Sequence, residues 1–147
     1  PYAQSSDLLE NDGIRVRVDN SYCVHAKYCF NKKSGIRALM SESVDSNAKS
    51  QIMAMIDRCP SGTFSYELDL DGEMAECEED LPCEISAISK DRCSATAGPL
   101  WVSGRVPIMQ PDGAYLEMRN RVTLCRCGQS KNKPFCDGTH GTIGFED

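Results

Sequence analysis

Three cysteines and one histidine lie within sixteen residues near the end of the chain, in the segment CRCGQSKNKPFCDGTH (125–140). Cys125, Cys127, Cys136 and His140 follow the spacing C-x-C-x8-C-x3-H. Three thiolates and an imidazole are soft ligands that suit zinc or an iron–sulfur cluster. Structural zinc sites more often use C-x2-C pairs, whereas a close pair followed by a distant pair suits two metal atoms. The spacing therefore favours an iron–sulfur cluster, with a zinc site or free thiols as the alternatives.

The same segment resembles the CDGSH iron–sulfur domain, whose pattern is C-x-C-x2-[ST]-x3-P-x-C-D-G-[SAT]-H. The chain has an allowed residue at every marked position, and Thr139 stands where the name-giving serine of the family would be. The resemblance extends upstream and covers about residues 98–145. Independently of it, the Asp137-Gly138 pair can begin a turn or a helix, which would direct free N–H groups at sulfur atoms.

The resemblance implies a 2Fe–2S cluster whose inner iron is held by Cys125 and Cys127, and whose outer iron is held by Cys136 and His140. A neutral imidazole in place of a thiolate makes such a site less negative and raises its reduction potential. Because iron binds the deprotonated ring, acid should weaken the outer iron first. The residues expected around the cluster without binding iron are Ser130, Asp137 and Thr139.

A second group of cysteines lies in the first half of the chain, as CVHAKYC (23–29) and as Cys59 before Pro60. On these residues, segment 14–70 resembles a divergent single-cluster ferredoxin domain. A ferredoxin loop for a 4Fe–4S cluster has a ligand midway, where this chain has Ala26. The three thiolates of Cys23, Cys29 and Cys59 therefore predict a 3Fe–4S cluster. The alternatives are a 4Fe–4S cluster, or three core thiols that bind no cluster. His25 is the candidate for a fourth ligand, or for a residue that hydrogen-bonds a sulfur.

Three further cysteines, Cys77, Cys83 and Cys93, fit neither group. Cys77 and Cys83 lie in an acidic stretch, where neighbouring carboxylates disfavour reactive thiolates. We expect surface or half-buried thiols. The alternatives are a disulfide between Cys77 and Cys83, or a ligand supplied to the first cluster.

Hydrophobic periodicity predicts where the regular elements lie. Residues 14–19 and 63–70 alternate between apolar and polar side chains, as half-buried strands do. A helix is expected over 45–59, capped by Asp45 or Ser46 and ended by Pro60. Residues 1–12 are polar and without period, so we expect a frayed segment. Beyond residue 60 the pattern predicts short strands, a turn at PDG (111–113) and almost no regular helix.

Together these patterns predict an α+β protein with an N-terminal ferredoxin-like half followed by a small β-rich CDGSH module. The ferredoxin-like domain is expected over 13–70, an acidic connector over 71–97 and the CDGSH domain over 98–147.

Charge and hydropathy exclude some classes of function. The net charge of −6 argues against a general nucleic-acid binder, and no apolar run is long enough to span a membrane. Clustered cysteines without a complete disulfide set predict a reducing compartment, the cytoplasm. An organellar matrix stays an alternative, since the chain begins at Pro1 and its start could be processed. Acidic residues gather in 67–84 and basic ones in 119–133, which predicts either solvated faces or docking surfaces for a charged partner.

The predicted function is one-electron transfer by a protein that carries two iron–sulfur clusters. The alternative is a redox- or pH-sensitive donor or sensor that releases its His-ligated 2Fe–2S cluster, and a structural zinc protein is a third class. No nucleophile–base pair is apparent, so we do not expect an enzyme. The expected partners are redox proteins or apo-acceptor proteins, and a homodimer through the β module stays open.

Overall fold

The computed structural model describes residues 6–30, 34–42, 44–91 and 95–147. The chain divides into two compact units. The first unit contains the chain up to Ser21, then Lys27–Cys59 and Thr63–Glu79. The second contains Tyr22–Ala26, Pro60–Gly62 and Asp80–Asp147. Two short segments from the N-terminal half, one around Cys23 and one directly after Cys59, thus belong to the C-terminal unit.

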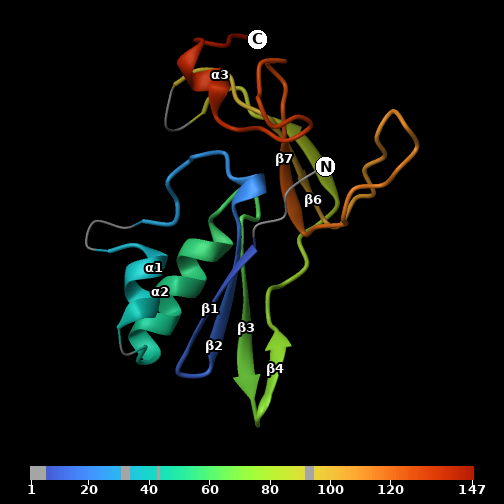
Figure 1. The fold of residues 1–147 in the computed structure, drawn as a ribbon. Helices are drawn as coiled ribbons and strands as arrows, with labels where there is room; N and C mark the ends of the chain where they lie inside the picture. Colours follow the sequence, from blue (N-terminus) through green and yellow to red (C-terminus); the bar gives the residue numbers. More distant parts are fainter. Residues whose placement is uncertain (1–5, 31–33, 43, 92–94) are drawn as a thin grey trace. The chain divides into compact units, whose positions relative to one another are not determined.

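An antiparallel sheet of four strands in the order β1-β2-β3-β4 forms the base of the first unit (Figure 1). The strands are β1 (Ser6–Asn11), β2 (Ile14–Asp19), β3 (Phe64–Leu70) and β4 (Glu73–Glu76). Alternation along β2 buries Ile14, Val16 and Val18, because successive side chains point to opposite faces of a strand. The buried face of this sheet is one wall of the first hydrophobic core.

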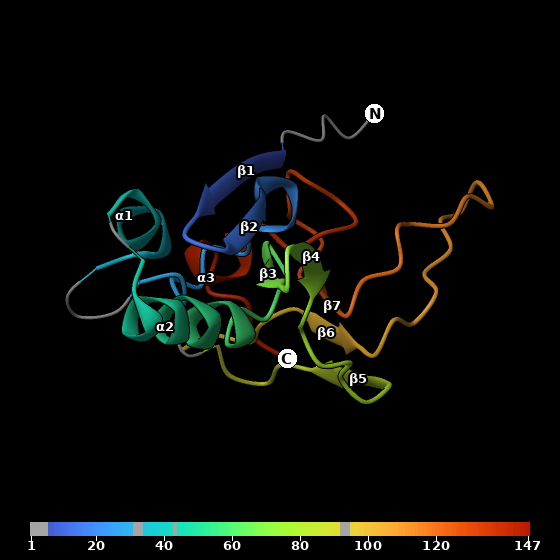
Figure 2. The ribbon, with the colours of Figure 1, turned by 90° about the horizontal axis from the view of Figure 1, so that it is seen from below.

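Two helices pack against this sheet, and Figures 1 and 2 show them side by side. They are α1 (Ile36–Ser41) and α2 (Ser46–Asp57). The Asp45 carboxylate caps α2 by accepting the backbone N–H of Ala48 at 2.8 Å. Ile52, Met55 and Ile56 are buried on one face of α2, at the spacing of an amphipathic helix. The helix ends before Pro60, as the sequence predicted.

The two predicted strands and the predicted helix of this unit are confirmed, each within two residues of its expected bounds. The expected frayed segment is wrong over Ser6–Asn11, which forms β1 and pairs along its whole length with β2. This edge strand is mostly exposed, so its hydrogen bonds to β2 hold it without an apolar period. Helix α1 was not predicted, and it is too short to show a periodic pattern.

The second unit is built on a three-stranded antiparallel sheet in the order β5-β6-β7. Its strands are β5 (Glu84–Ala87), β6 (Leu100–Ser103) and β7 (Arg121–Leu124), all labelled in Figure 2. A short 3-10 turn, η1 (Asn20–Tyr22), leads into this unit, where the Tyr22 ring packs on the Phe135 ring at a centroid distance of 4.5 Å. Val102 and Val122 complete this second core. The α+β class is thereby confirmed.

The change from the first unit to the second falls between Glu79 and Asp80, inside the predicted acidic connector 71–97. Most of the regular structure in that connector belongs to the two sheets: β4 extends the first one and β5 the second. Beyond residue 60, the helix that the described residues form is the four-residue α3 (Thr139–Thr142). None of the helices among the described residues is long and apolar enough to cross a bilayer.

Candidate metal centres

The segment 125–140 is held together by a short piece of β-structure. Leu124 at the end of β7 forms an isolated antiparallel bridge with Phe135. On either side of it, the Cys125 N–H donates to the Pro134 carbonyl at 2.8 Å, and the Cys136 N–H donates to the Thr123 carbonyl at 3.0 Å. These backbone bonds place the start and the end of the motif side by side.

The four predicted ligands form two pairs. The sulfur atoms of Cys125 and Cys127 lie 3.9 Å apart, and the Cys136 sulfur lies 3.3 Å from Nδ1 of His140. Cys136 and His140 are each only 3% exposed. Among the residues that the structure describes, no group of three or more His, Cys, Asp or Glu side chains is arranged around one metal ion. Two pairs of soft donors fit two iron atoms with two protein ligands each.

Backbone N–H groups point at the sulfur atoms of both pairs. Gln129 donates to Cys127 Sγ at 3.5 Å, and Gly138 donates to Cys136 Sγ at 3.4 Å. Gly138 is the N-cap of α3 with a φ of +87°, so of the turn or helix that the sequence allowed at the Asp137-Gly138 pair, the structure forms a short helix. Such N–H···S bonds stabilise a thiolate, and they tune the potential of a metal–sulfur site.

The three residues expected around the predicted ligands form hydrogen bonds within the loop that carries those ligands. The Asp137 carboxylate accepts both the N–H and the hydroxyl of Thr139, and it also accepts the N–H of Lys131 at 2.9 Å. Burial by itself raises the pKa of Asp137, but these hydrogen bonds outweigh it and lower the pKa below its usual value. The buried Ser130 hydroxyl donates to the Phe135 carbonyl at 2.6 Å. Asp137 and Ser130 therefore fix the turns between the ligands.

Asp91 is a further residue of this site, and no motif in the sequence indicated it. Its Oδ2 contacts Nε2 of His140 closely, although 49 residues separate the two. A carboxylate on the remote nitrogen of a ligand histidine fixes the tautomer and the orientation of the ring. Here it leaves Nδ1 directed at the Cys136 sulfur. A contact between residues so far apart in the sequence depends on the tertiary structure and leaves no local motif.

The protein environment opposes ionisation of the Cys136 thiol. Burial raises the pKa of Cys136 to about 11, although the N–H of Gly138 acts in the opposite direction. Because iron binds the thiolate, binding of metal at this position must release a proton at neutral pH.

The cysteines of the first group are divided between the two units. Cys29 and Cys59 belong to the first unit, where Cys29 packs against the core and Cys59 is buried just after α2. Cys23 belongs to the second unit, where its sulfur accepts the N–H of His25 at 3.3 Å. Their action as one ligand set stays a prediction from the sequence.

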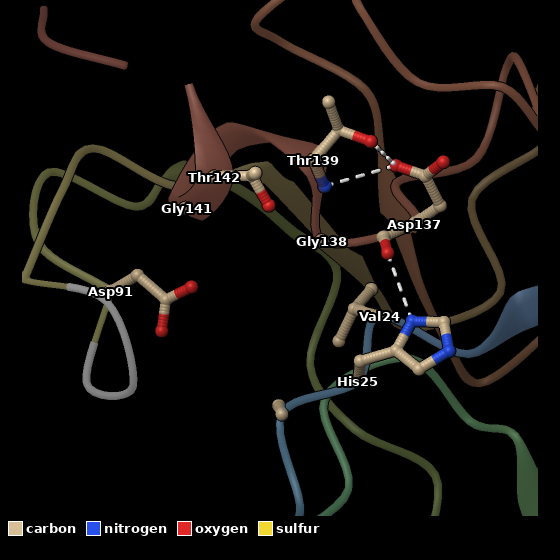
Figure 3. A pocket seen from close by; sticks show the side chains of 9 residues that line it. Val24, His25, Asp91, Asp137, Gly138, Thr139, Gly141 and Thr142 are labelled. Atoms are coloured by element: carbon tan, nitrogen blue, oxygen red, sulfur yellow. Dashed lines mark hydrogen bonds between the residues drawn. The ribbon is translucent and has the colours of Figure 1, made fainter. Parts of the chain in front are cut away.

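The His25 ring lies against the second cysteine motif, a position that sequence reasoning did not anticipate. Its Nδ1 is 2.9 Å from the Asp137 carbonyl oxygen. Figure 3 shows this contact at the edge of an open pocket of about 300 Å³, which Asp91 and Thr142 also line. Because a carbonyl only accepts hydrogen bonds, Nδ1 carries the proton in this contact, and in the neutral ring Nε2 then has a lone pair.

Of the remaining cysteines, Cys77 and Cys83 are free thiols that hydrogen-bond different backbone carbonyls, those of Ala75 and Gly104. No disulfide joins them, and Cys93 lies outside the described residues.

The basic stretch 119–133 is partly used inside the second unit. The Arg119 guanidinium lies 3.8 Å from the centre of the Tyr22 ring. Arg126 donates to the carbonyls of Gly98 and Ile88 at 2.9 and 2.8 Å. These two arginines therefore stabilise the fold around the ligands, so the stretch is not simply a solvated rim.

Comparison with known families agrees with both halves of this description. Residues 97–141 match the family model described as an iron-binding zinc finger of CDGSH type. Residues 9–69 match the model of a divergent 4Fe-4S mono-cluster domain. The chain is thus an iron–sulfur protein. Within that class, it joins a segment similar to divergent 4Fe-4S mono-cluster domains to a segment similar to CDGSH domains. Comparisons with curated proteins and with solved structures gave no match.

Proposed function

We propose that this protein carries two iron–sulfur clusters and takes part in one-electron transfer. The observation that carries the proposal is the arrangement of Cys125, Cys127, Cys136 and His140 as two pairs, with N–H groups directed at the sulfurs. A 2Fe–2S cluster takes up and returns a single electron without group transfer. What the chain would supply is the two pairs of side chains that hold the iron atoms.

At the proposed 2Fe–2S site, each group of residues has a distinct task. Cys125 and Cys127 would hold one iron, and Cys136 and His140 the other. The N–H groups of Gln129 and Gly138 offset the negative charge that builds up on the sulfurs on reduction. Burial of Cys136 and His140 keeps bulk water away from that iron, while Cys125 and Cys127 are half-buried.

For the first site we propose a 3Fe–4S cluster held by Cys23, Cys29 and Cys59. The support is that Ala26 has no atom that could bind iron. Three thiolates suit a 3Fe–4S cluster, which has one iron fewer than a 4Fe–4S cluster. The name of the matched family model favours the alternative, a 4Fe–4S cluster. That alternative needs a fourth ligand, for which His25 Nε2 or solvent is available.

Counting iron and sulfide while recording EPR spectra of the oxidised and reduced protein tests this proposal. A 2Fe–2S plus a 3Fe–4S cluster requires about five irons per chain, and a 4Fe–4S cluster in the first site raises the count to about six. An oxidised 3Fe–4S signal in the isolated protein is the expected result. A count of about two irons would overturn the two-cluster proposal, and a colourless zinc-containing protein would overturn the iron–sulfur centre altogether.

A second candidate function is a redox- or pH-sensitive donor or sensor that releases the 2Fe–2S cluster. The imidazole ligand favours it, because His140 can leave iron by protonation, whereas a thiolate does so less readily. The His140→Cys variant separates the two functions. A donor should transfer its cluster to an apo-ferredoxin, and His140→Cys should slow that transfer and prolong the cluster's lifetime at pH 5–6. A relay should instead keep both clusters through repeated reduction and oxidation.

The same proposal defines the partners and the setting. We propose redox proteins as partners for a relay and apo-acceptor proteins for a donor, with a homodimer still open. The protein is proposed to act in a reducing compartment and not as an enzyme. Electron transfer should require only the approach of a partner to the half-buried Cys125 and Cys127.

A further inference from the structure

Two short segments of the second unit share one local geometry around a cysteine. They are Cys23-Val24-His25 and Cys136-Asp137-Gly138. In each, the N–H of the third residue donates to the sulfur of the first, at 3.3 Å for Cys23 and 3.4 Å for Cys136. In each, that third residue has a positive φ, +58° for His25 and +87° for Gly138. A histidine tolerates this conformation better than most side chains do.

The two segments also face each other. The His25 ring donates from Nδ1 to the Asp137 carbonyl at 2.9 Å, as the dashed line in Figure 3 shows. In return, Gly138 lies so close to the first segment that a Cβ there would be 2.8 Å from the Val24 carbonyl oxygen. The close approach therefore depends on the His25 ring in one segment and on the lack of a Cβ atom at Gly138 in the other.

One peptide group connects the ring to the second sulfur. The carbonyl that accepts from His25 and the N–H that donates to Cys136 Sγ both belong to the peptide between Asp137 and Gly138. A hydrogen bond accepted at a peptide oxygen polarises the group and strengthens the bond that its N–H donates, by roughly 10–30%. The His25 ring thus acts on the Cys136 sulfur through two hydrogen bonds and one peptide.

We propose that His25 is a positioning residue that links the two cluster sites. Its backbone N–H donates to the Cys23 sulfur. Its ring orients and polarises the peptide whose N–H donates to the Cys136 sulfur. This inference rests on the proposed function, since it takes Cys23 and Cys136 as ligands of two different clusters. The link raises the potential of the 2Fe–2S site, because N–H···S bonds favour the more negative reduced state.

Two substitutions at one position test the link in the intact, cluster-containing protein. His25→Gly removes the ring without a penalty for positive φ. His25→Asn also tolerates positive φ and keeps a short side-chain donor for the Asp137 carbonyl. Lys27→Gly is the matched control, because Lys27 is an exposed residue of the same stretch with a φ of +61°. A redox titration followed by EPR measures the 2Fe–2S potential in each protein, and iron analysis follows the first site.

We expect His25→Gly to reduce the equilibrium constant for reduction of the 2Fe–2S cluster by up to about twofold, because the peptide loses a polarisation that strengthens its N–H···S bond by roughly 10–30%. His25→Asn should recover most of that loss, and Lys27→Gly should match the wild type. Equal potentials in His25→Gly and Lys27→Gly would overturn the proposal. Loss of one iron from the first site in both His25 variants would also overturn it, by making His25 a ligand. A wild-type count of two irons removes the two-cluster function, yet the effect on the 2Fe–2S potential can still be measured.

Discussion

The two cysteine groups differ in how the chain assembles them. The second group comes from one segment of sixteen residues, and a backbone bridge between Leu124 and Phe135 holds the two ends of that segment together. The first group comes from Cys23 in one unit and from Cys29 and Cys59 in the other. A site made from one segment can be recognised from spacing alone, whereas a site made from distant segments depends on how the whole fold arranges them.

The same difference appears in the residues around each group. In the second group, Asp137 and Ser130 close turns within the segment that carries the ligands. In the first group, the His25 side chain, two residues after Cys23, contacts Asp137, a residue of the other motif. The second motif therefore fixes its own turns, and it also helps to position part of the first.

Removing one ligand from each group is the strongest way to break this comparison. Cys136→Ser should abolish the 2Fe–2S signal and lower the iron content by about two per chain, because the outer iron loses a thiolate. Cys59→Ser should remove the first cluster and leave the 2Fe–2S signal in place. Iron analysis and EPR measure both effects, and Cys83→Ser is the control, since Cys83 is an exposed thiol outside both groups.

Loss of both clusters from either variant would contradict this expectation. It would mean that the two sites assemble only together, so that the contrast between a local site and a dispersed site has no functional meaning.

Which parts of the molecule could be predicted follows from the same contrast. The C-x-C-x8-C-x3-H spacing indicated four side chains that the structure brings together in two pairs, because the motif is contiguous. That these side chains bind iron stays a prediction. Strand β2 was predicted because its alternation reflects burial on one side of a sheet. Strand β1 could not be predicted from period, because its pairing with β2 stabilises it more than burial does. Asp91 and the His25 ring are long-range contacts of the second motif, and no local pattern encodes contacts of that kind.

Asp91→Asn tests whether the second site depends on a residue outside its own segment. An amide is a weaker acceptor than a carboxylate, so the His140 ring loses its firm orientation and some basicity. Changes of this kind typically reduce metal affinity about 10- to 100-fold. We expect faster loss of the visible absorbance of the 2Fe–2S cluster on incubation with a chelator. In a His140→Cys background, Asp91→Asn should have little effect, and an undiminished effect there would assign Asp91 a purely structural role.

Two glycine substitutions sharpen the contrast between strain within the motif and contact with the other segment. Gly138 and Gly128 have positive φ values of +87° and +76°, so alanine at either position costs roughly 1–2 kcal/mol of backbone strain. Only at Gly138 would the added methyl group also meet the Val24 carbonyl. Overpacking of that kind adds about 1–3 kcal/mol. Chemical denaturation should therefore show a larger loss of stability for Gly138→Ala, and equal losses would mean that the contact with Val24 is readily relaxed.

The last expected effect concerns the cluster-free protein at high pH. Burial raises the pKa of Cys136 from its ordinary value of 9.0 to about 11, so the folded state keeps the thiol proton at a pH where the unfolded chain has lost it. Stability is then fully present below pH 9 and falls as the pH rises toward 11, because the folded state binds more protons in that range. Cys136→Ala should flatten this decline in denaturation curves of the cluster-free protein. With iron bound, Cys136 is already a thiolate at neutral pH, and the same decline should be absent. An identical decline with and without iron would indicate that Cys136 does not bind the metal, and the 2Fe–2S site would then lack one of its four ligands.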